Sequence, residues 1–65
     1  MNNFQILCGI AESISIANKF TIIIIQIKDD LYEVNICQKL ETCINIFKGN
    51  FEDVQNLLLV LKKSK

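Results

Sequence analysis

A run of β-branched residues in the first half of this chain limits its possible folds more than any other part of the sequence. Residues 20–28 contain six such side chains, four of them consecutive isoleucines. β-Branched residues suit a pleated sheet and disfavour a helix, so the segment predicts a strand. Asp29-Asp30 is typical of a tight turn, and Leu31–Gln38 has the pattern of a returning strand. The sequence therefore predicts a β-hairpin.

The hydrophobic pattern also predicts how the strands pair. A two-residue turn sets Lys28 opposite Leu31. The pairs that follow on one face are all apolar: Ile27 with Tyr32, Ile25 with Val34, and Ile23 with Ile36. A three-residue loop, Lys39-Leu40-Glu41, then leads to a third strand, Thr42–Lys48. There Ile44 faces Ile36 and Ile46 faces Val34, which continues the same apolar face.

A helix is predicted at each end of the chain. In residues 3–17 the apolar positions follow helical spacing: Phe4, Leu7, Ala11 and Ile14. Asn2 or Asn3 can cap its start, and Asn18 suits a left-handed stop. Residues 12–16 also alternate as a strand does, so two structures remain open there.

The second helix follows Asn50, a good N-cap, with Asp53 at its third position. Glu52 and Asp53 complement the positive end of this helix, and its lysines complement the negative end. Its predicted buried stripe is Phe51, Val54, Leu57, Leu58 and Leu61. The fold class is therefore α+β. We expect one domain over residues 1–65, in the order α-β-β-β-α, as a three-stranded antiparallel meander with helices packed on one face.

The expected second face of the sheet is more apolar than solvent exposure favours. The register above places six residues there as a candidate interface: Phe20, Ile22, Ile24, Cys37, Cys43 and Phe47. Leu59 and Val60 also fall beside the main stripe of the second helix. A patch of this kind usually marks an interface, although cover by the first helix is an alternative. The first strand is also an edge that is uncharged over residues 20–27, and such an edge invites another strand.

The size of the chain favours the same interpretation. A domain of 65 residues buries only about 60% of its unfolded surface, so its core alone is marginal. Three cysteines are too few for a secreted disulfide scaffold, and an odd number leaves one of them unpaired. We therefore expect a protein partner or a homodimer to supplement the core. Cys8 is expected in the core. Cys37 and Cys43 are expected to lie opposite each other, either as small apolar residues or as a redox-sensitive or intermolecular disulfide.

Enzymatic chemistry is not expected. The chain has no histidine, which is the commonest general base and metal ligand, and only two glycines, too few for a phosphate-cradling loop. The carboxylate pairs Asp29-Asp30 and Glu52-Asp53 have ordinary places in a turn and at a helix start. No cofactor, metal site, small-molecule substrate or membrane span is expected, and we expect a cytoplasmic protein with reduced thiols.

The predicted order of elements resembles double-stranded-RNA-binding domains. That resemblance implies phosphate contacts, for which Lys62, Lys63 and Lys65 are the candidates in this chain. The start of the last helix is acidic here, however, and there is no arginine and no net positive charge. Short chains of this order are also similar to accessory proteins of phages and other mobile elements, which implies binding to another protein. A non-enzymatic interaction module is therefore the expected function; a nucleic-acid-binding module and a structural subunit of a larger assembly are the alternatives.

Overall fold

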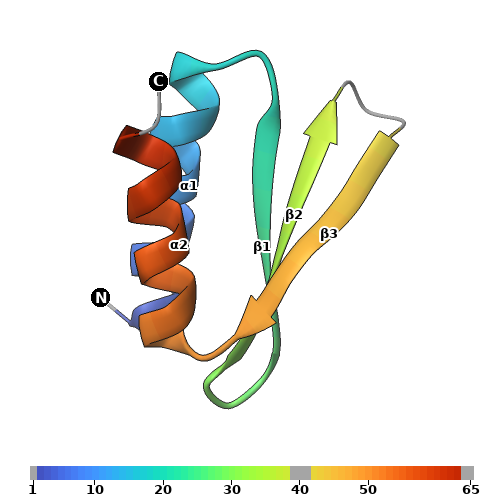
Figure 1. The fold of residues 1–65 in the computed structure, drawn as a ribbon. Coiled ribbons are helices and arrows are strands. Elements are labelled where there is room, and N and C mark those ends of the chain that lie inside the picture. The colour runs from blue at the N-terminus through green and yellow to red at the C-terminus, as the bar shows by residue number, and fades with distance from the viewer. Residues whose placement is uncertain (1, 39–41, 64–65) are drawn as a thin grey trace.

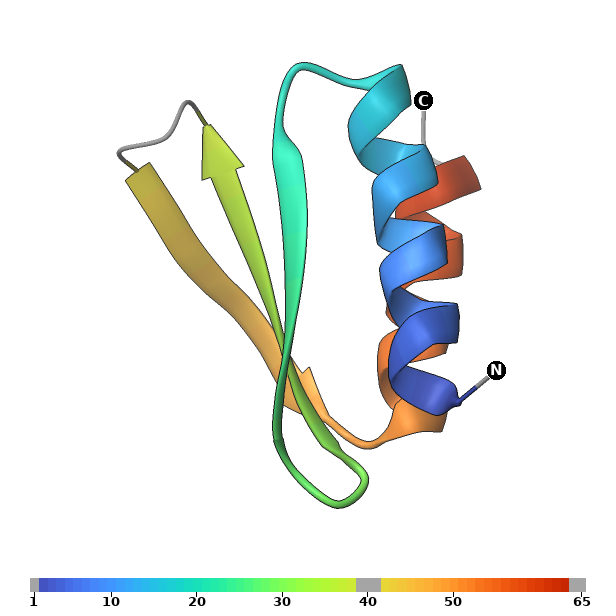
Figure 2. The same ribbon diagram turned by 180° about the vertical axis from the view of Figure 1, so that it is seen from behind.

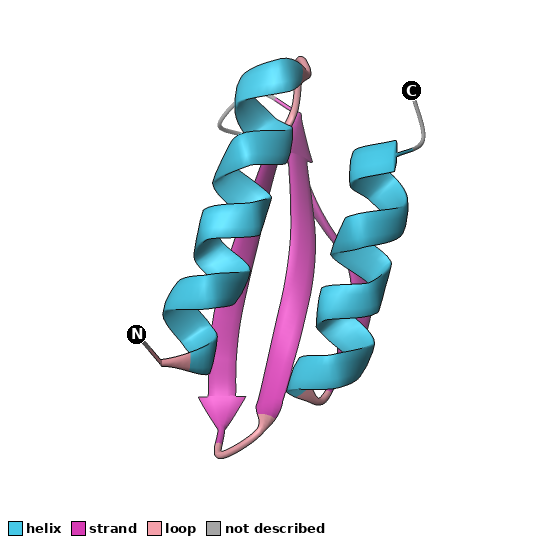
Figure 3. Ribbon diagram, turned by 90° about the vertical axis from the view of Figure 1, so that its left-hand side faces the viewer, coloured by secondary structure: helices cyan, strands magenta, loops and turns pink. Residues whose placement is uncertain are grey.

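The computed structural model describes residues 2–38 and 42–63 of the chain. Its elements are α1 (Asn3–Ala17), β1 (Thr21–Lys28), β2 (Leu31–Gln38), β3 (Thr42–Gly49) and α2 (Phe51–Lys63). The strands form one antiparallel sheet in the order β1-β2-β3. Both helices lie side by side on the same side of this sheet (Figures 1, 2 and 3). The predicted α+β meander, with the order α-β-β-β-α, is confirmed.

Polar side chains define both ends of α1. The Asn2 side chain accepts a hydrogen bond from the Gln5 N–H (2.9 Å), and the Gln5 side chain accepts one from the Asn2 N–H (3.1 Å). This reciprocal pair is a capping box. The helix continues to Ala17, so the strand-like alternation of residues 12–16 does not break it. Asn18 ends it in an extended conformation (φ −134°), and the predicted left-handed stop is wrong.

The end of the β1–β2 hairpin is tied to the start of α2. Asp30 occupies the left-handed region (φ 55°) in the tight turn, and its carboxylate accepts a hydrogen bond from the Phe51 N–H at 3.1 Å. The Asn50 side chain accepts another from the Asp53 N–H at 2.9 Å. Two of the N–H groups that a helix start leaves unpaired are thereby satisfied, which confirms Asn50 as the N-cap and fixes α2 against the hairpin.

The core lies between the helices and the sheet. Its buried members come from four of the five elements: Leu7, Ala11, Ile14, Ile22, Ile24, Tyr32, Val34, Val54 and Leu58. Several larger side chains, among them Phe4, Phe20, Phe47 and Phe51, are partly buried against this cluster. The helical stripes predicted from spacing are therefore confirmed. The residues that the sheet contributes differ from the prediction.

A register shift in the first hairpin reverses the two faces of β1. Lys28 pairs with Leu31 as predicted, but the next pair is Gln26 with Tyr32, so Ile27 is an additional residue in the ladder. Side chains alternate between the faces of a strand, so one additional residue moves all later ones to the opposite face. Ile22 and Ile24 are consequently buried, with 5% and 6% exposure, whereas Ile23 and Ile25 are half-exposed. The predicted inward placement of Ile23, Ile25 and Ile27 is wrong.

A second irregularity occurs in β3. Ile44 pairs with Ile36 and Cys43 with Cys37, as predicted. The next pairs are Asn35 with Asn45 and Val34 with Phe47, so Ile46 is an additional residue in the ladder and does not pair with Val34. Phe47 therefore turns toward the core and packs against it, and the prediction that it lies on the outer face is wrong. The predicted loop over residues 39–41 lies outside the described residues.

Candidate functional site

The outer face of the sheet, opposite the helices, carries exposed isoleucines on β1. Alternation places Ile23 and Ile25 of β1 on it, next to Asn35 and Glu33 of β2. Glu33 in turn forms an ion pair with Lys48 of β3, with Nζ and Oε2 3.4 Å apart. Asn35, Glu33 and Lys48 therefore make the outer face polar beside Ile23 and Ile25. The other exposed isoleucines of the described strands, Ile44 and Ile46, lie on β3.

We call Ile23, Ile25 and Ile27 the β1 row. Their side chains are 41%, 46% and 43% exposed. Other large apolar side chains with substantial exposure are distributed over three further elements: Ile16, Ile44, Ile46, Leu59 and Val60. Single exposed apolar residues are ordinary, whereas a contiguous row indicates a contact surface. Ile23 and Ile25 lie on the outer face of this edge strand by alternation, and Ile27, the additional residue of the ladder, follows them toward the turn, so the three form a row along one edge.

The interface residues proposed from sequence do not form one exposed patch. Ile22 and Ile24 belong to the core, and Phe20 and Phe47 are half-buried against it. Cys37 is buried and Cys43 is exposed. The expected outer placement is therefore wrong for Ile22 and Ile24, and the surplus apolar surface of the sheet lies one residue away, on the β1 row. Leu59 and Val60 are exposed on α2, as predicted.

Cys37 and Cys43 are joined by a disulfide within the chain. They are directly opposite on neighbouring strands, with Cα atoms 4.0 Å apart. Pairs without backbone hydrogen bonds bring side chains closest in an antiparallel ladder, which explains how two adjacent strands can be joined. Of the two interpretations drawn from the sequence, small apolar residues or a disulfide, the structure has the disulfide. The expectation of reduced thiols is therefore wrong at these two positions in the structure. The bond fixes the β2–β3 pairing at the end of β2 and the start of β3.

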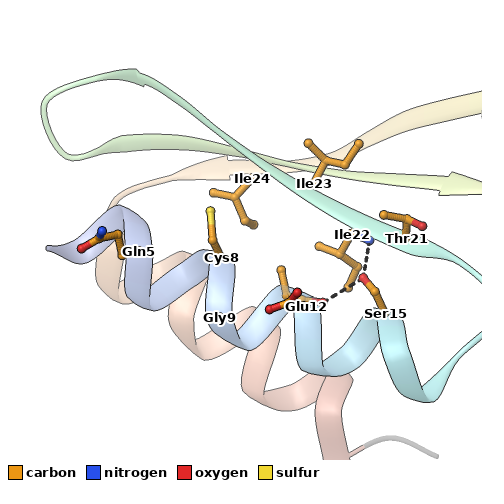
Figure 4. Close-up of a pocket in the computed structure, with 10 residues that line it drawn as sticks. Gln5, Cys8, Gly9, Glu12, Ser15, Thr21, Ile22, Ile23 and Ile24 are labelled. Carbon is orange, nitrogen blue, oxygen red and sulfur yellow. Dashed lines mark hydrogen bonds between the residues drawn. The ribbon is translucent and has the colours of Figure 1, made fainter. Parts of the chain in front are cut away.

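An open groove runs between α1 and the free edge of β1 (Figure 4). Gln5 and Cys8 lie at its Ile24 end, and Glu12 and Ser15 at its Ile22 end. The Ser15 hydroxyl donates to the Ala11 carbonyl (2.8 Å) and accepts a hydrogen bond from the Ile22 N–H (2.9 Å). Ser15 therefore attaches α1 to the edge of β1. The sequence indicated an open edge at this strand but not the groove, because the groove depends on where α1 packs.

Cys8 is half-buried in this groove, where burial raises the pKa of its thiol above the ordinary value of 9.0. Because the thiolate is the reactive form, we expect iodoacetamide to alkylate Cys8 more slowly in the folded chain than in urea at the same pH.

The raised pKa also predicts how stability depends on pH. As the pH rises, the Cys8 thiol loses its proton in the unfolded chain before it does so in the folded chain, so the free energy of unfolding should fall above about pH 9. Urea titrations of the wild type and Cys8→Ala should differ in this fall. Equal pH dependence of the two proteins would contradict the assignment.

The structure describes two of the three lysines proposed as phosphate contacts. Lys62 and Lys63 are exposed in the last turn of α2, where they complement the negative end of the helix. Lys65 lies outside the described residues. The other end of α2 carries Glu52 and Asp53, so no basic surface extends along this helix.

The remaining chemical features can be stated for residues 2–38 and 42–63. Within these ranges no three His, Cys, Asp or Glu side chains gather as they do around a metal ion. No helix in them is long and apolar enough to cross a membrane. Asp30 and Asp53 act at the start of α2, as described above. The β1 row and the groove beside it, in contrast, have no role in the fold that the described contacts explain.

Comparison of the chain with protein-family models, with curated proteins and with solved structures finds no match.

Proposed function

We propose that this protein is a small, non-enzymatic interaction module that self-associates through the β1 side of the molecule. The observation that carries the proposal is the β1 row, three isoleucines between 41% and 46% exposed on an edge strand. Edge strands in stable monomers are usually protected by charge, proline or a covering element. Residues 20–27 contain neither charge nor proline, and the additional residue of the ladder is at Ile27 next to the turn, so the edge from Thr21 to Gln26 is suited to a protein contact.

The energetics are consistent with moderate affinity. Completing the burial of a half-exposed isoleucine contributes about 1 kcal/mol, and a two-fold contact buries the β1 row of each chain. The gross gain of about 6 kcal/mol is increased by backbone hydrogen bonds at about 1 kcal/mol each. Association costs at least about 4 kcal/mol. These magnitudes correspond to dissociation in the micromolar to millimolar range.

Light scattering across a dilution series tests the proposal. We expect a mass of twice the 7.4 kDa of one chain at about 1 mM, falling toward one chain near about 1 µM. The protein should carry Cys8→Ser, so that no intermolecular disulfide through Cys8 contributes to the mass. A mass of one chain over the whole series would overturn self-association.

A further inference from the structure

The two ends of β3 are held to the rest of the protein in different ways. Ile46 is the additional residue in the ladder with β2, and it separates residues 42–45 from residues 47–49. In the second of these segments Phe47 packs against the core, and Lys48 forms the ion pair with Glu33. We call residues 42–45 the leading segment. Each of its residues is exposed, and none belongs to the core.

The helices leave the leading segment uncovered. Figure 1 shows the start of β3 standing away from both helices, whereas the end of the strand leads into α2. Ile44 lies opposite Ile36, which packs against the core, yet Ile44 is 61% exposed. The Asn45 side chain donates a hydrogen bond within the strand, to the Phe47 carbonyl (3.5 Å). Within the described part of the chain, the leading segment is therefore attached by its ladder with β2 and by the Cys37–Cys43 disulfide.

The disulfide can be reached from the β3 side. Cys43 is exposed, whereas Cys37 is only 5% exposed. Thiol–disulfide exchange begins with the attack of a thiolate on one of the two sulfurs, and access helps to decide which sulfur is attacked. A thiolate from solution therefore reaches Sγ of Cys43, and Sγ of Cys37 is the leaving group. Exposed disulfides are also among those that are reduced most easily.

We propose that the Cys37–Cys43 disulfide is a reversible redox clamp that holds the leading segment on β2 and that a dithiol reductant opens it. One thiolate of the reductant bonds to Sγ of Cys43, the bond between the two cysteines breaks, and Cys37 leaves as a thiolate that takes a proton from water. The second thiolate of the reductant then attacks the reductant's own sulfur in this mixed disulfide and releases Cys43, which also takes a proton. The reductant becomes a disulfide, and the two electrons that it loses reduce the pair to two thiols.

The opening is local, because the clamp lies outside the core. Neither cysteine belongs to the cluster that joins the helices to the sheet, so that packing is retained after reduction. The two residues are also only six apart in sequence, and a cross-link between near neighbours constrains the unfolded chain least. Once released from Cys37, the leading segment separates from β2 as far as Ile46. The edge of β2 beside it is then uncovered, and an uncovered edge can pair with another strand.

Mapping the mixed disulfide tests the direction of attack. Glutathione, which has a single thiol, is added to folded Cys8→Ser protein, and free thiols are blocked with N-ethylmaleimide at early times. Trypsin cleaves after Lys39, so Cys37 and Cys43 fall on different peptides. Mass spectrometry should find glutathione on Cys43 and maleimide on Cys37, at a rate that rises with the glutathione concentration. Glutathione mainly on Cys37, or a rate independent of its concentration, would overturn the proposal.

Amide hydrogen exchange tests the local opening. The Cys8→Ser protein is measured oxidised, reduced with dithiothreitol, and oxidised again. Reduction should speed exchange in the leading segment at least about tenfold, while residues 47–49 and β1 keep their rates, and oxidation should restore the slow exchange. Unchanged rates in the leading segment would show that the ladder alone holds it. Faster exchange throughout the sheet would show that the disulfide supports the whole domain, and either of these results overturns the clamp.

Discussion

Ile24→Lys should abolish folding. Ile24 is 6% exposed in the core, where it pairs with the fully buried Val34. A lysine there must bury its ammonium without a partner, which costs several kcal/mol. A domain of 65 residues has a total stability of about 3 to 10 kcal/mol, so the loss removes most or all of it. Far-UV circular dichroism and the dispersion of amide NMR signals measure the result.

The matched control is the next residue along the strand. Ile23→Lys carries the same change to a side chain that is 41% exposed on the outer face, and it should retain the helix and sheet content of the wild type. The pair therefore tests the register shift at Ile27. If Ile24→Lys folded and Ile23→Lys did not, the faces of β1 would be assigned the wrong way round.

Leu58→Ala should have the second largest effect. Leu58 lies in α2 with no exposed surface and packs in the cluster that joins both helices to the sheet. Removing the side chain loses its transfer free energy and leaves a cavity, at a cost of about 2 to 5 kcal/mol. Urea unfolding monitored by circular dichroism should show a much lower midpoint with an unchanged slope, because the variant remains two-state.

Leu59→Ala is the control for this substitution. Leu59 is the same residue type at the next position of the same helix, but it is 40% exposed. The change should cost no more than about 0.5 to 1 kcal/mol, since alanine also favours the helix. Equal losses at Leu58 and Leu59 would show that α2 does not present the face seen in the structure.

Much of the secondary structure was predictable because its signals are local. Six β-branched residues in nine predicted β1, and helical spacing predicted the buried positions Leu7, Ala11 and Ile14 of α1. Asn50 was identified as a cap from its place before an apolar stripe, and it accepts the Asp53 N–H as expected. Each of these signals depends on residues within a few positions of one another.

The candidate site was less predictable. The two faces of β1 are nearly equal in composition, since Ile22 and Ile24 alternate with Ile23 and Ile25. Periodicity therefore could not determine which pair faces the helices. The additional residue at Ile27 reversed the assignment, and with it the candidate interface. The charge-free edge was visible in the sequence, but Ser15 beside Ile22 was not, because that contact depends on how α1 packs.

Local propensity and spacing were enough to predict the elements, their order, the tight turn at Asp29-Asp30, the helix faces and the open first strand. Which isoleucines are buried, and where the groove lies, became known from the packing of the whole chain. A strand that is apolar on both faces can pack either way. The choice is made by contacts with distant residues: the helices that cover one face, and the pairing of Gln26 with Tyr32 and of Phe47 with Val34.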